Sequence, residues 1–439
     1  MNGAARSLPT PEAFEQQLTH FINATLLGGG DAVRPDTRLF EEGYINSLRI
    51  LDLIAVVEKT LDRRIPDRAV RLANFRTVAT IVRAFHPDAA APSAPAAPSD
   101  RLFEHRTTRD RLASPIDALV QRGDLTITGA GQVTLSGLAL DILRAVDDTV
   151  VQWAAALGAA ERSYPSLIDH DILVRAGQVD SFPQHLTRVC HPDEERSREE
   201  GATRTSSPLD QSRERDGRSL VANAPPHDRH GRHALAPAVC YHSYPEWQGR
   251  AIGPEPALLT ACGRCYRYEG GAHVALERLW EFSMREIVVL GTQEQVERVR
   301  QGLVKQVSVL VTTLGLDGVI EIAADPFFTS GDEGRRLMQQ AGALKYELQL
   351  TIERDGRRLA VASFNHHHEF FGRRFDITLA AGGPAHTGCV AFGLERWVLA
   401  VLAQHGVDAR DWPEDASRWL ETSRARRART AARPGGVGV

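Results

Sequence analysis

Three arginines in the second half of the chain have the type and order of side chains that hold a nucleoside triphosphate. Arg267 begins the pattern Arg-x-Glu with Glu269, and a short glycine-containing loop leads to Arg278-Leu279-Trp280-Glu281-Phe282. Two antiparallel strands joined by this loop would direct Arg267 toward an α-phosphate. The guanidinium group suits that position because it stays charged and can meet phosphate oxygens at two points.

Phe282 and Arg396 would complete this nucleotide site. Phe282 offers a flat face on which adenine can stack. Arg396 follows Gly393 at the start of a predicted helix and would hold the outer phosphates. Fixed cations lower the barrier when a carboxylate attacks the α-phosphorus, because negative charge builds there. Each pattern alone also fits a surface salt bridge, but their order favours function, so Arg267 and Arg396 are the candidate catalytic residues.

The five cysteines are odd in number and widely scattered, which argues against a disulfide framework and leaves metal binding open. Cys262 and Cys265 form a single C-x-x-C, usually half of a four-ligand zinc site. No second pair exists, so we interpret both as strand residues. Cys190 is interpreted as inert. The run His-His-His-Glu at 366–369 also suggests a metal, but adjacent strand residues face opposite ways, so no more than two could share one ion.

Residues 43–48, Gly-Tyr-Ile-Asn-Ser-Leu, resemble the attachment loop of an acyl carrier protein. Carrier proteins usually have Asp-Ser-Leu there, and Asn46 keeps the helix cap while losing a negative charge. A serine that merely caps a helix is the alternative. The resemblance implies 4'-phosphopantetheine on Ser47 and a phosphopantetheinyl transferase as a partner.

The larger part of the chain, residues 102–421, resembles the amino acid:[carrier protein] ligases. That family is similar to the catalytic domain of the atypical zinc-dependent seryl-tRNA synthetases and lacks their tRNA-binding domain. The resemblance rests on Ala-Val-Cys-Tyr at 238–241, the arginine motif at 267–282, Met-Arg-Glu at 284–286, Asp-Pro-Phe-Phe at 325–328, Ser-Phe-Asn-His at 363–366 and Gly-Cys-Val-Ala-Phe-Gly at 388–393. Residues 177–183 resemble motif 1 of class II synthetases, which implies a homodimer.

The resemblance also implies a set of site residues. The zinc ligands would be Cys240, Glu286 and Cys389. Two thiolates and one carboxylate can hold Zn²⁺ with a fourth position open, as in reactive zinc sites, and a neutral α-amine could fill that position. The nucleotide and substrate contacts would be Arg267, Glu269, Arg278, Leu279, Phe282, Lys345, Ser363, Phe364, Asn365 and Arg396. Mg²⁺ is expected with ATP, although the acidic ligand that class II synthetases often place before the Asn is Leu359 here.

The hydrophobic periodicity divides the chain into four parts. Residues 1–86 predict a small four-helix carrier bundle, 87–101 an Ala/Pro-rich linker, 102–423 the activating domain, and 424–439 a disordered basic tail. Within the activating domain, 191–232 is predicted to be a mobile insertion. Helices are expected at 12–27, 77–85 and 137–157, and strands at 286–290, 318–323, 346–353 and 358–365. This order predicts an α+β fold, with an antiparallel class II synthetase-like sheet flanked by helices.

Composition is ordinary, with 42% hydrophobic and 25% charged residues. No apolar run approaches the roughly 18 residues of a membrane helix, and the first ten residues do not resemble a signal peptide, so we expect a cytoplasmic protein. The net charge of -4 gives no electrostatic footprint for tRNA.

The hypothesis from the sequence is an enzyme that activates a small amino acid, glycine or alanine, with ATP as an aminoacyl adenylate. It would then load the amino acid onto the phosphopantetheine thiol of its own carrier domain or of a separate carrier protein. Two alternatives stay open, a tRNA-charging enzyme similar to seryl-tRNA synthetase and an inactive scaffold in which only the carrier works.

Overall fold

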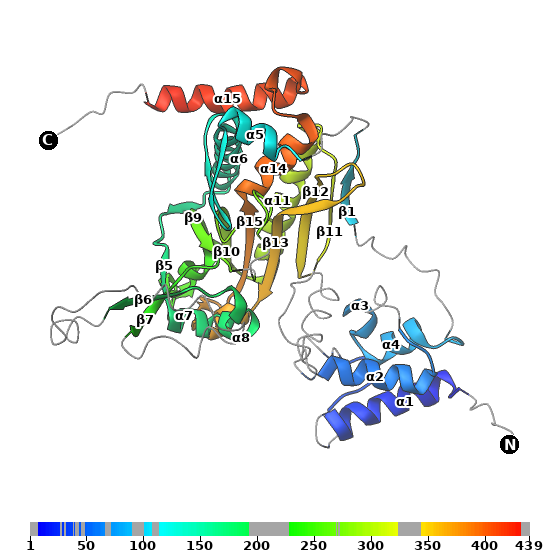
Figure 1. Cartoon of the computed structure of the whole chain (residues 1–439). Coiled ribbons are helices and arrows are strands. Elements are labelled where there is room, and N and C mark those ends of the chain that lie inside the picture. Colours follow the sequence, from blue (N-terminus) through cyan, green and yellow to red (C-terminus); the bar gives the residue numbers. More distant parts are fainter. Residues whose placement is uncertain are drawn as a thin grey trace, which may run out of the picture.

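The computed structural model describes residues 8–26, 29, 32–37, 39, 44, 49–65, 72–89, 101–107, 114–192, 228–268, 270, 273–323 and 344–431. They form an N-terminal helical bundle and a larger region of sheet and helices (Figure 1). Within these ranges no helix combines the length and the apolar character needed to cross a membrane.

The N-terminal bundle has its own hydrophobic core. Its helices are α1 (Pro11–Phe21), which continues into a π-helical turn (Ile22–Leu26), α2 (Arg49–Leu61), α3 (Leu72–Phe75) and α4 (Val78–Phe85). Thr77 begins α4 with a capping box, as Thr77 and Thr80 satisfy each other's backbone N–H groups. The helix predicted at 77–85 forms as α4, and the helix predicted at 12–27 forms as α1 and the π-helical turn that follows it. Ser47 lies outside the described residues.

The larger region is built on a sheet whose order is β1-β11-β12-β13-β15-β10-β9-β4. Its strands are β1 (Arg101–His105), β4 (Ala160–Arg162), β9 (Ala257–Tyr266), β10 (Glu281–Gly291), β11 (Gly318–Ile322), β12 (Lys345–Thr351), β13 (Arg358–His368) and β15 (His386–Gly393). Neighbouring strands are antiparallel except β4 and β9, which are parallel. This confirms the α+β prediction. The four predicted strands form, three of them within three residues of their expected bounds, whereas β10 begins at Glu281 and not at 286.

One face of the sheet is covered by three long helices, α6 (Gly137–Ala156), α11 (Gln293–Thr313) and α14 (Leu394–His405), which lie beside it in Figure 1. The main core forms there, because alternate side chains of each strand point to this face. Phe364, Phe392 and Trp397 are fully buried in it. The strand residues that alternate with these core residues face the other side of the sheet, where the candidate site residues lie.

Smaller elements complete the region. They are α5 (Ile116–Arg122), β2 (Leu125–Gly129), β3 (Gln132–Leu135), β5 (Leu167–Asp169), α7 (His170–Arg175), α8 (Gln178–Ser181), β6 (Arg188–Pro192), β7 (Asp228–Leu235), α10 (Ser243–Glu246), β8 (Ala251–Ile252), α13 (Phe370–Arg374), β14 (Thr378–Leu379) and α15 (Glu414–Ala431).

The predicted disordered tail is wrong for residues 424–431, which belong to α15. Arg424 donates a 2.7 Å hydrogen bond to Asp141 on α6. Arg427 lies 3.2 Å from Asp141 and 3.3 Å from Asp148. Arg424 and Arg427, two arginines of the predicted basic tail, are therefore partners of carboxylates on a helix far away in the sequence.

Two further boundaries need correction. The ends of the predicted insertion at 191–232 are not mobile loops, since His191 pairs with Arg229 and Pro192 with Asp228 as β6 and β7 form an antiparallel pair. Residues 193–227 lie outside the described part of the chain. The linker predicted at 87–101 ends one residue early, because Arg101 begins β1.

A glycine in α13 provides a test of this packing. A Cβ atom at Gly372 would lie 2.1 Å from the carbonyl oxygen of Ala385, just before β15. We expect Gly372→Ala to lower the free energy of unfolding by about 1–3 kcal/mol through overpacking. Gly302→Ala, on α11 with no heavy atom within 4 Å, is the matched control and should raise it by about 0.5–1 kcal/mol.

Tryptophan fluorescence during urea unfolding measures both variants. All six tryptophans lie between residues 153 and 419, so the signal reports on the larger region alone. Equal midpoints for Gly372→Ala and the unmodified chain would contradict the close approach of α13 to Ala385.

Candidate active site

The face of the sheet opposite the long helices carries the candidate site. Antiparallel register places Asn365 of β13 beside Cys389 of β15, and Ser363 beside Ala391. Ala391 in turn pairs with Glu286 of β10. The alternation of the three strands therefore directs a carboxamide, a hydroxyl, a thiol and a carboxyl group to one side of the sheet.

Cys240, Glu286 and Cys389 converge on this face. Each offers one ligand atom, and the three atoms lie within 4.8 Å of one another. Cys240 comes from a short 3₁₀ turn (Cys240–His242), whereas the other two are strand residues. All three are buried, with 5%, 2% and 5% of their surface exposed. Three residues that are far apart in the sequence thus form one compact group of acidic ligands.

The electrostatics of this group favour a cation. Burial and then the neighbouring Cys389 raise the pKa of Glu286 to about 8, although Arg267 opposes the shift. The contact with Cys389, together with burial, raises the pKa of Cys240. Oε2 of Glu286 is buried and accepts no hydrogen bond from the described residues. A divalent cation would compensate the negative charges of these three side chains, which are otherwise unfavourable in a buried position. Two sulfurs with one carboxylate are suitable ligands for Zn²⁺.

Two neighbours orient Cys389. The Asn365 side-chain amide lies 3.3 Å from the Cys389 carbonyl oxygen and 3.5 Å from its Sγ. Nε2 of His367 lies 3.9 Å from the same Sγ, and its Nδ1 lies 3.2 Å from the Thr387 hydroxyl. The sequence places Asn365 in the predicted nucleotide pocket and predicts no role for His367. Strand alternation was the signal that could have placed His367 on the same face as Asn365.

Tyr244, which sequence reasoning also missed, lies next to the three ligands. Its ring is fully buried and stacks on Phe371 with centroids 4.0 Å apart. The pKa of its hydroxyl is raised by burial and then by Cys240, Cys389 and Glu286. The hydroxyl oxygen has no hydrogen-bond partner in the described ranges. Tyr244 therefore belongs to the hydrophobic packing beside the cluster.

The arginines are held by main-chain carbonyl groups near this face. Arg267 donates from Nε to Pro237 (2.8 Å), and its guanidinium carbon lies 5.5 Å from the centre of the Phe282 ring. Arg396 donates from Nε to Glu277 (2.8 Å) and from Nη1 to Ala360 (3.1 Å). The bonds fix the planes of both guanidinium groups, as a phosphate site requires.

Lys345, Ser363 and Phe364 are also predicted nucleotide contacts. Lys345 is nearly buried and forms a 2.8 Å ion pair with Glu347. Ser363 accepts a 3.1 Å hydrogen bond from Asn365. Phe364 is fully buried on the opposite, helix-covered face, so its assignment to the nucleotide pocket is wrong. It alternates with Ser363 and Asn365, which explains the error.

Three other residues are predicted to contact the nucleotide or the substrate, namely Arg278, Leu279 and Glu269. Arg278 lies in an isolated bridge with Val274 at the base of the predicted loop, and Leu279 beside it is buried. Glu269 lies outside the described residues. Sequence reasoning also missed Glu395, a buried carboxylate of α14 whose two oxygens accept from the Ser283 N–H at 2.9 and 2.8 Å.

Comparison with known proteins identifies the family. The chain is 31% identical over 309 residues to amino acid–[acyl-carrier-protein] ligase 1 of Bradyrhizobium diazoefficiens, covering 70% of this chain and 90% of the relative. The chain belongs to this ligase family. Ligase 2 of the same organism is 34% identical over 255 residues, covering 57% of this chain and 71% of that relative.

Two family descriptions match separate parts of the ligase. Residues 231–405 match the tRNA synthetase class II core domain (G, H, P, S and T), and residues 22–85 match the phosphopantetheine attachment site. A type-2 serine–tRNA ligase of Methanopyrus kandleri is 31% identical over 271 residues, covering 59% of this chain and half of that enzyme.

Solved structures confirm the class II synthetase-like fold. The M. kandleri SerRS, crystallised with A. aeolicus tRNASec, has a TM-score of 0.60 at 24% identity, covering 73% of this chain and 63% of that chain. Seryl-tRNA synthetase from Pyrococcus horikoshii, complexed with ATP, has a TM-score of 0.52 at 14% identity, covering 72% and 64%.

The thiolate ligands can be tested with Co²⁺ in place of Zn²⁺. We expect the Co²⁺-loaded ligase to show a sulfur-to-metal charge-transfer band, because Cys240 and Cys389 would both bind the ion as thiolates. Cys389→Ala should lose most of this band. Cys262→Ala is the control and should keep it, since Cys262 lies in β9 outside the cluster. An unchanged band in Cys389→Ala would contradict the assignment.

Binding of the ion should also depend on pH. Because the pKa of Glu286 is raised to about 8, its carboxyl group carries a proton below that pH when no cation is bound. A cation must displace this proton, so its apparent affinity should rise by about tenfold per pH unit for each proton displaced. Titration of the charge-transfer band between pH 6 and 8 measures this rise, and a constant affinity over that range would contradict it.

Proposed function

We propose that this ligase activates a small amino acid with ATP and transfers it to the thiol of a carrier protein. In the first step the amino acid carboxylate attacks the α-phosphorus of ATP, and pyrophosphate leaves. In the second, the carrier thiol attacks the acyl carbon of the aminoacyl adenylate, and AMP leaves as the thioester forms. The convergence of Cys240, Glu286 and Cys389 beside Arg267 is the observation that carries this proposal.

The three converging residues would hold Zn²⁺ through two sulfurs and one carboxylate oxygen. When bound, the ion would supply a Lewis-acidic position for a neutral α-amine. Asn365 and His367 orient Cys389 from the same face of the sheet. Substrate selection at this position would depend on a free amino group. Glycine or alanine is the proposed substrate, as the resemblance to the ligase family implies.

The nucleotide would lie against the arginines. Arg267 would bind the α-phosphate and Arg396 the outer phosphates, while Phe282 would stack on adenine. Activation needs positioned positive charge more than a general base. Mg²⁺ is expected with ATP, and Glu347 is our candidate ligand. Glu347 pairs in register with Ser363, on the face of the sheet that carries the candidate site. Leu359, which occupies the position where class II synthetases often have the acidic ligand, is buried in the main core.

The carrier domain would receive the amino acid. The match of residues 22–85 to the phosphopantetheine attachment site supports Ser47 as the modified residue, and a phosphopantetheinyl transferase would be the modifying partner. The carrier that is loaded could be this domain, the domain of a second copy, or a separate protein. We also propose a homodimer formed through residues 177–183, and a cytoplasmic location where ATP is available.

Pyrophosphate exchange and intact mass together test this function. We expect glycine or alanine to stimulate ATP–pyrophosphate exchange, and the phosphopantetheinylated chain to gain the mass of one aminoacyl group. Arg267→Ala should lower exchange by about 10²–10³-fold, because one charge-stabilising group at the reacting centre is lost. Ser47→Ala is the matched control, since it should keep exchange and lose the mass gain.

Two outcomes would contradict the proposal. Exchange at background with all twenty amino acids would indicate an inactive scaffold with a working carrier. Transfer of the amino acid to tRNA, with no thioester on any carrier, would indicate a tRNA-charging enzyme, which the similarity to the type-2 serine–tRNA ligases makes the main rival.

A further inference from the structure

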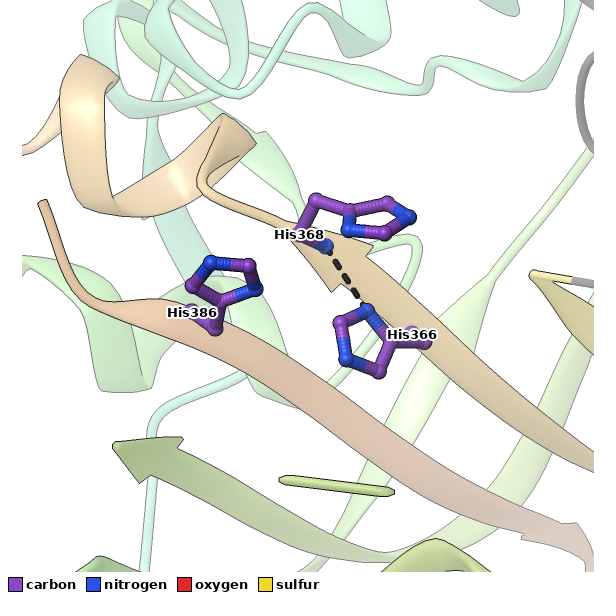
Figure 2. A group of neighbouring side chains, drawn as sticks. All are labelled: His366, His368 and His386. Carbon is purple, nitrogen blue, oxygen red and sulfur yellow. Dashed lines mark hydrogen bonds between the residues drawn. The ribbon is translucent and has the colours of Figure 1, made fainter. Parts of the chain in front are cut away.

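Three histidines gather on the side of the sheet opposite Cys389. His366 and His368 alternate along the end of β13, and His386 begins the neighbouring strand β15. Figure 2 shows their rings around one common space. Within one strand at most two histidines of the run are expected to share an ion, because adjacent strand residues face opposite ways. The third histidine comes from the next strand.

The geometry of the three rings suits a metal ion. Each offers one ring nitrogen, and these atoms lie within 4.8 Å of one another. The ring centroids are 4.5 Å apart for His366 and His368, and 5.7 Å apart for each of these rings and His386. A β-bulge between His366 and His368, and a left-handed backbone at His368 (φ 48°), bring these rings together.

We propose that His366, His368 and His386 form a second metal site, which binds one divalent transition cation such as Zn²⁺, Co²⁺ or Ni²⁺. Three imidazole nitrogens with a further position for water are a common ligand set for these ions. The site is separate from the thiolate cluster formed by Cys240, Glu286 and Cys389, because the three histidines lie on the other face of β13 and β15. His367, between two of the proposed ligands, faces Cys389 instead.

The hydrogen bonds of the three rings leave nitrogen atoms available for a metal. Nδ1 of His386 is buried and has no partner among the described residues, and Figure 2 shows a nitrogen of this ring directed toward the other two. Nε2 of His386 lies 3.8 Å from Oε1 of Glu369, a carboxylate that could orient the ring. Nδ1 of His366 accepts a 3.1 Å hydrogen bond from the His368 N–H. The buried Nε2 of His366 has no hydrogen-bond partner among the described residues, so the protein alone does not satisfy this ring fully.

The surroundings allow a charged ion to enter and remain. His366 is buried, whereas His368 and His386 are partly exposed, so the site can be reached from solvent. The nearest positive group on α11, Arg300, lies over the ring of Tyr346 at 4.3 Å and is paired with Glu297 at 2.7 Å. Its charge is therefore partly compensated. An ion here would join β13 to β15 directly behind Cys389 and so hold the register of the amino acid site.

Metal stoichiometry tests the proposal. The full chain, purified without a histidine tag and stripped with a chelator, is dialysed against Co²⁺ and its metal content is measured. We expect two ions per chain. His386→Gln and His368→Asn should each retain one ion and the full charge-transfer band, because the thiolate cluster is untouched; Asn is chosen at 368 since it tolerates a positive φ. His20→Gln, an exposed histidine of α1, should retain two ions.

The opposite results would overturn the proposal. These are one ion per unmodified chain with the full band, or two ions in both histidine variants. Circular dichroism and the tryptophan signal show whether each variant is folded. The charge-transfer band keeps this test separate from the proposed activity, because it reports on Cys240 and Cys389 alone. Failure of the histidine site would leave that band and the pyrophosphate exchange unchanged.

Discussion

The antiparallel register of β10, β15 and β13 is the constraint on which the rest of the structure depends. It places Glu286, Cys389 and Asn365 on one face, while the residues between them fill the core beneath the long helices. A shift of one residue in any of these strands would bury the polar side chains among the helices and expose aromatic ones. The same register that builds the core therefore assembles the site.

The site has an energetic cost that explains its chemistry. A carboxyl group and two thiols are buried within a few ångströms of one another, and burial raises the pKa of Glu286 to about 8. Hydrophobic side chains of similar volume at these positions would make the folded chain more stable. The acidic groups are therefore explained if a cation neutralises them. Because three protein ligands leave a tetrahedral ion one open position, the arrangement suits the capture of a substrate amine.

Local patterns predicted the elements, and long-range pairing explains what they missed. The helix expected at 137–157 forms as α6, and the predicted strands form with small changes at their ends. The three positions proposed as zinc ligands came from resemblance, since no spacing rule brings them together. The proposed role of His386 and the partners of Arg424 on α6 depend on which strand or helix lies alongside, and local patterns do not give that pairing. The burial of Phe364 follows from strand alternation with Ser363 and Asn365.

Anomalous X-ray scattering at the zinc edge from crystals of the full chain would test the central claim most directly. The account predicts a peak among Cys240, Glu286 and Cys389, about 2.3 Å from each sulfur and about 2.0–2.2 Å from a carboxylate oxygen. A soaked amino acid should add its nitrogen as the fourth ligand. Zinc-loaded crystals with no peak at these residues, or with the sulfurs pointing away from the ion, would contradict it.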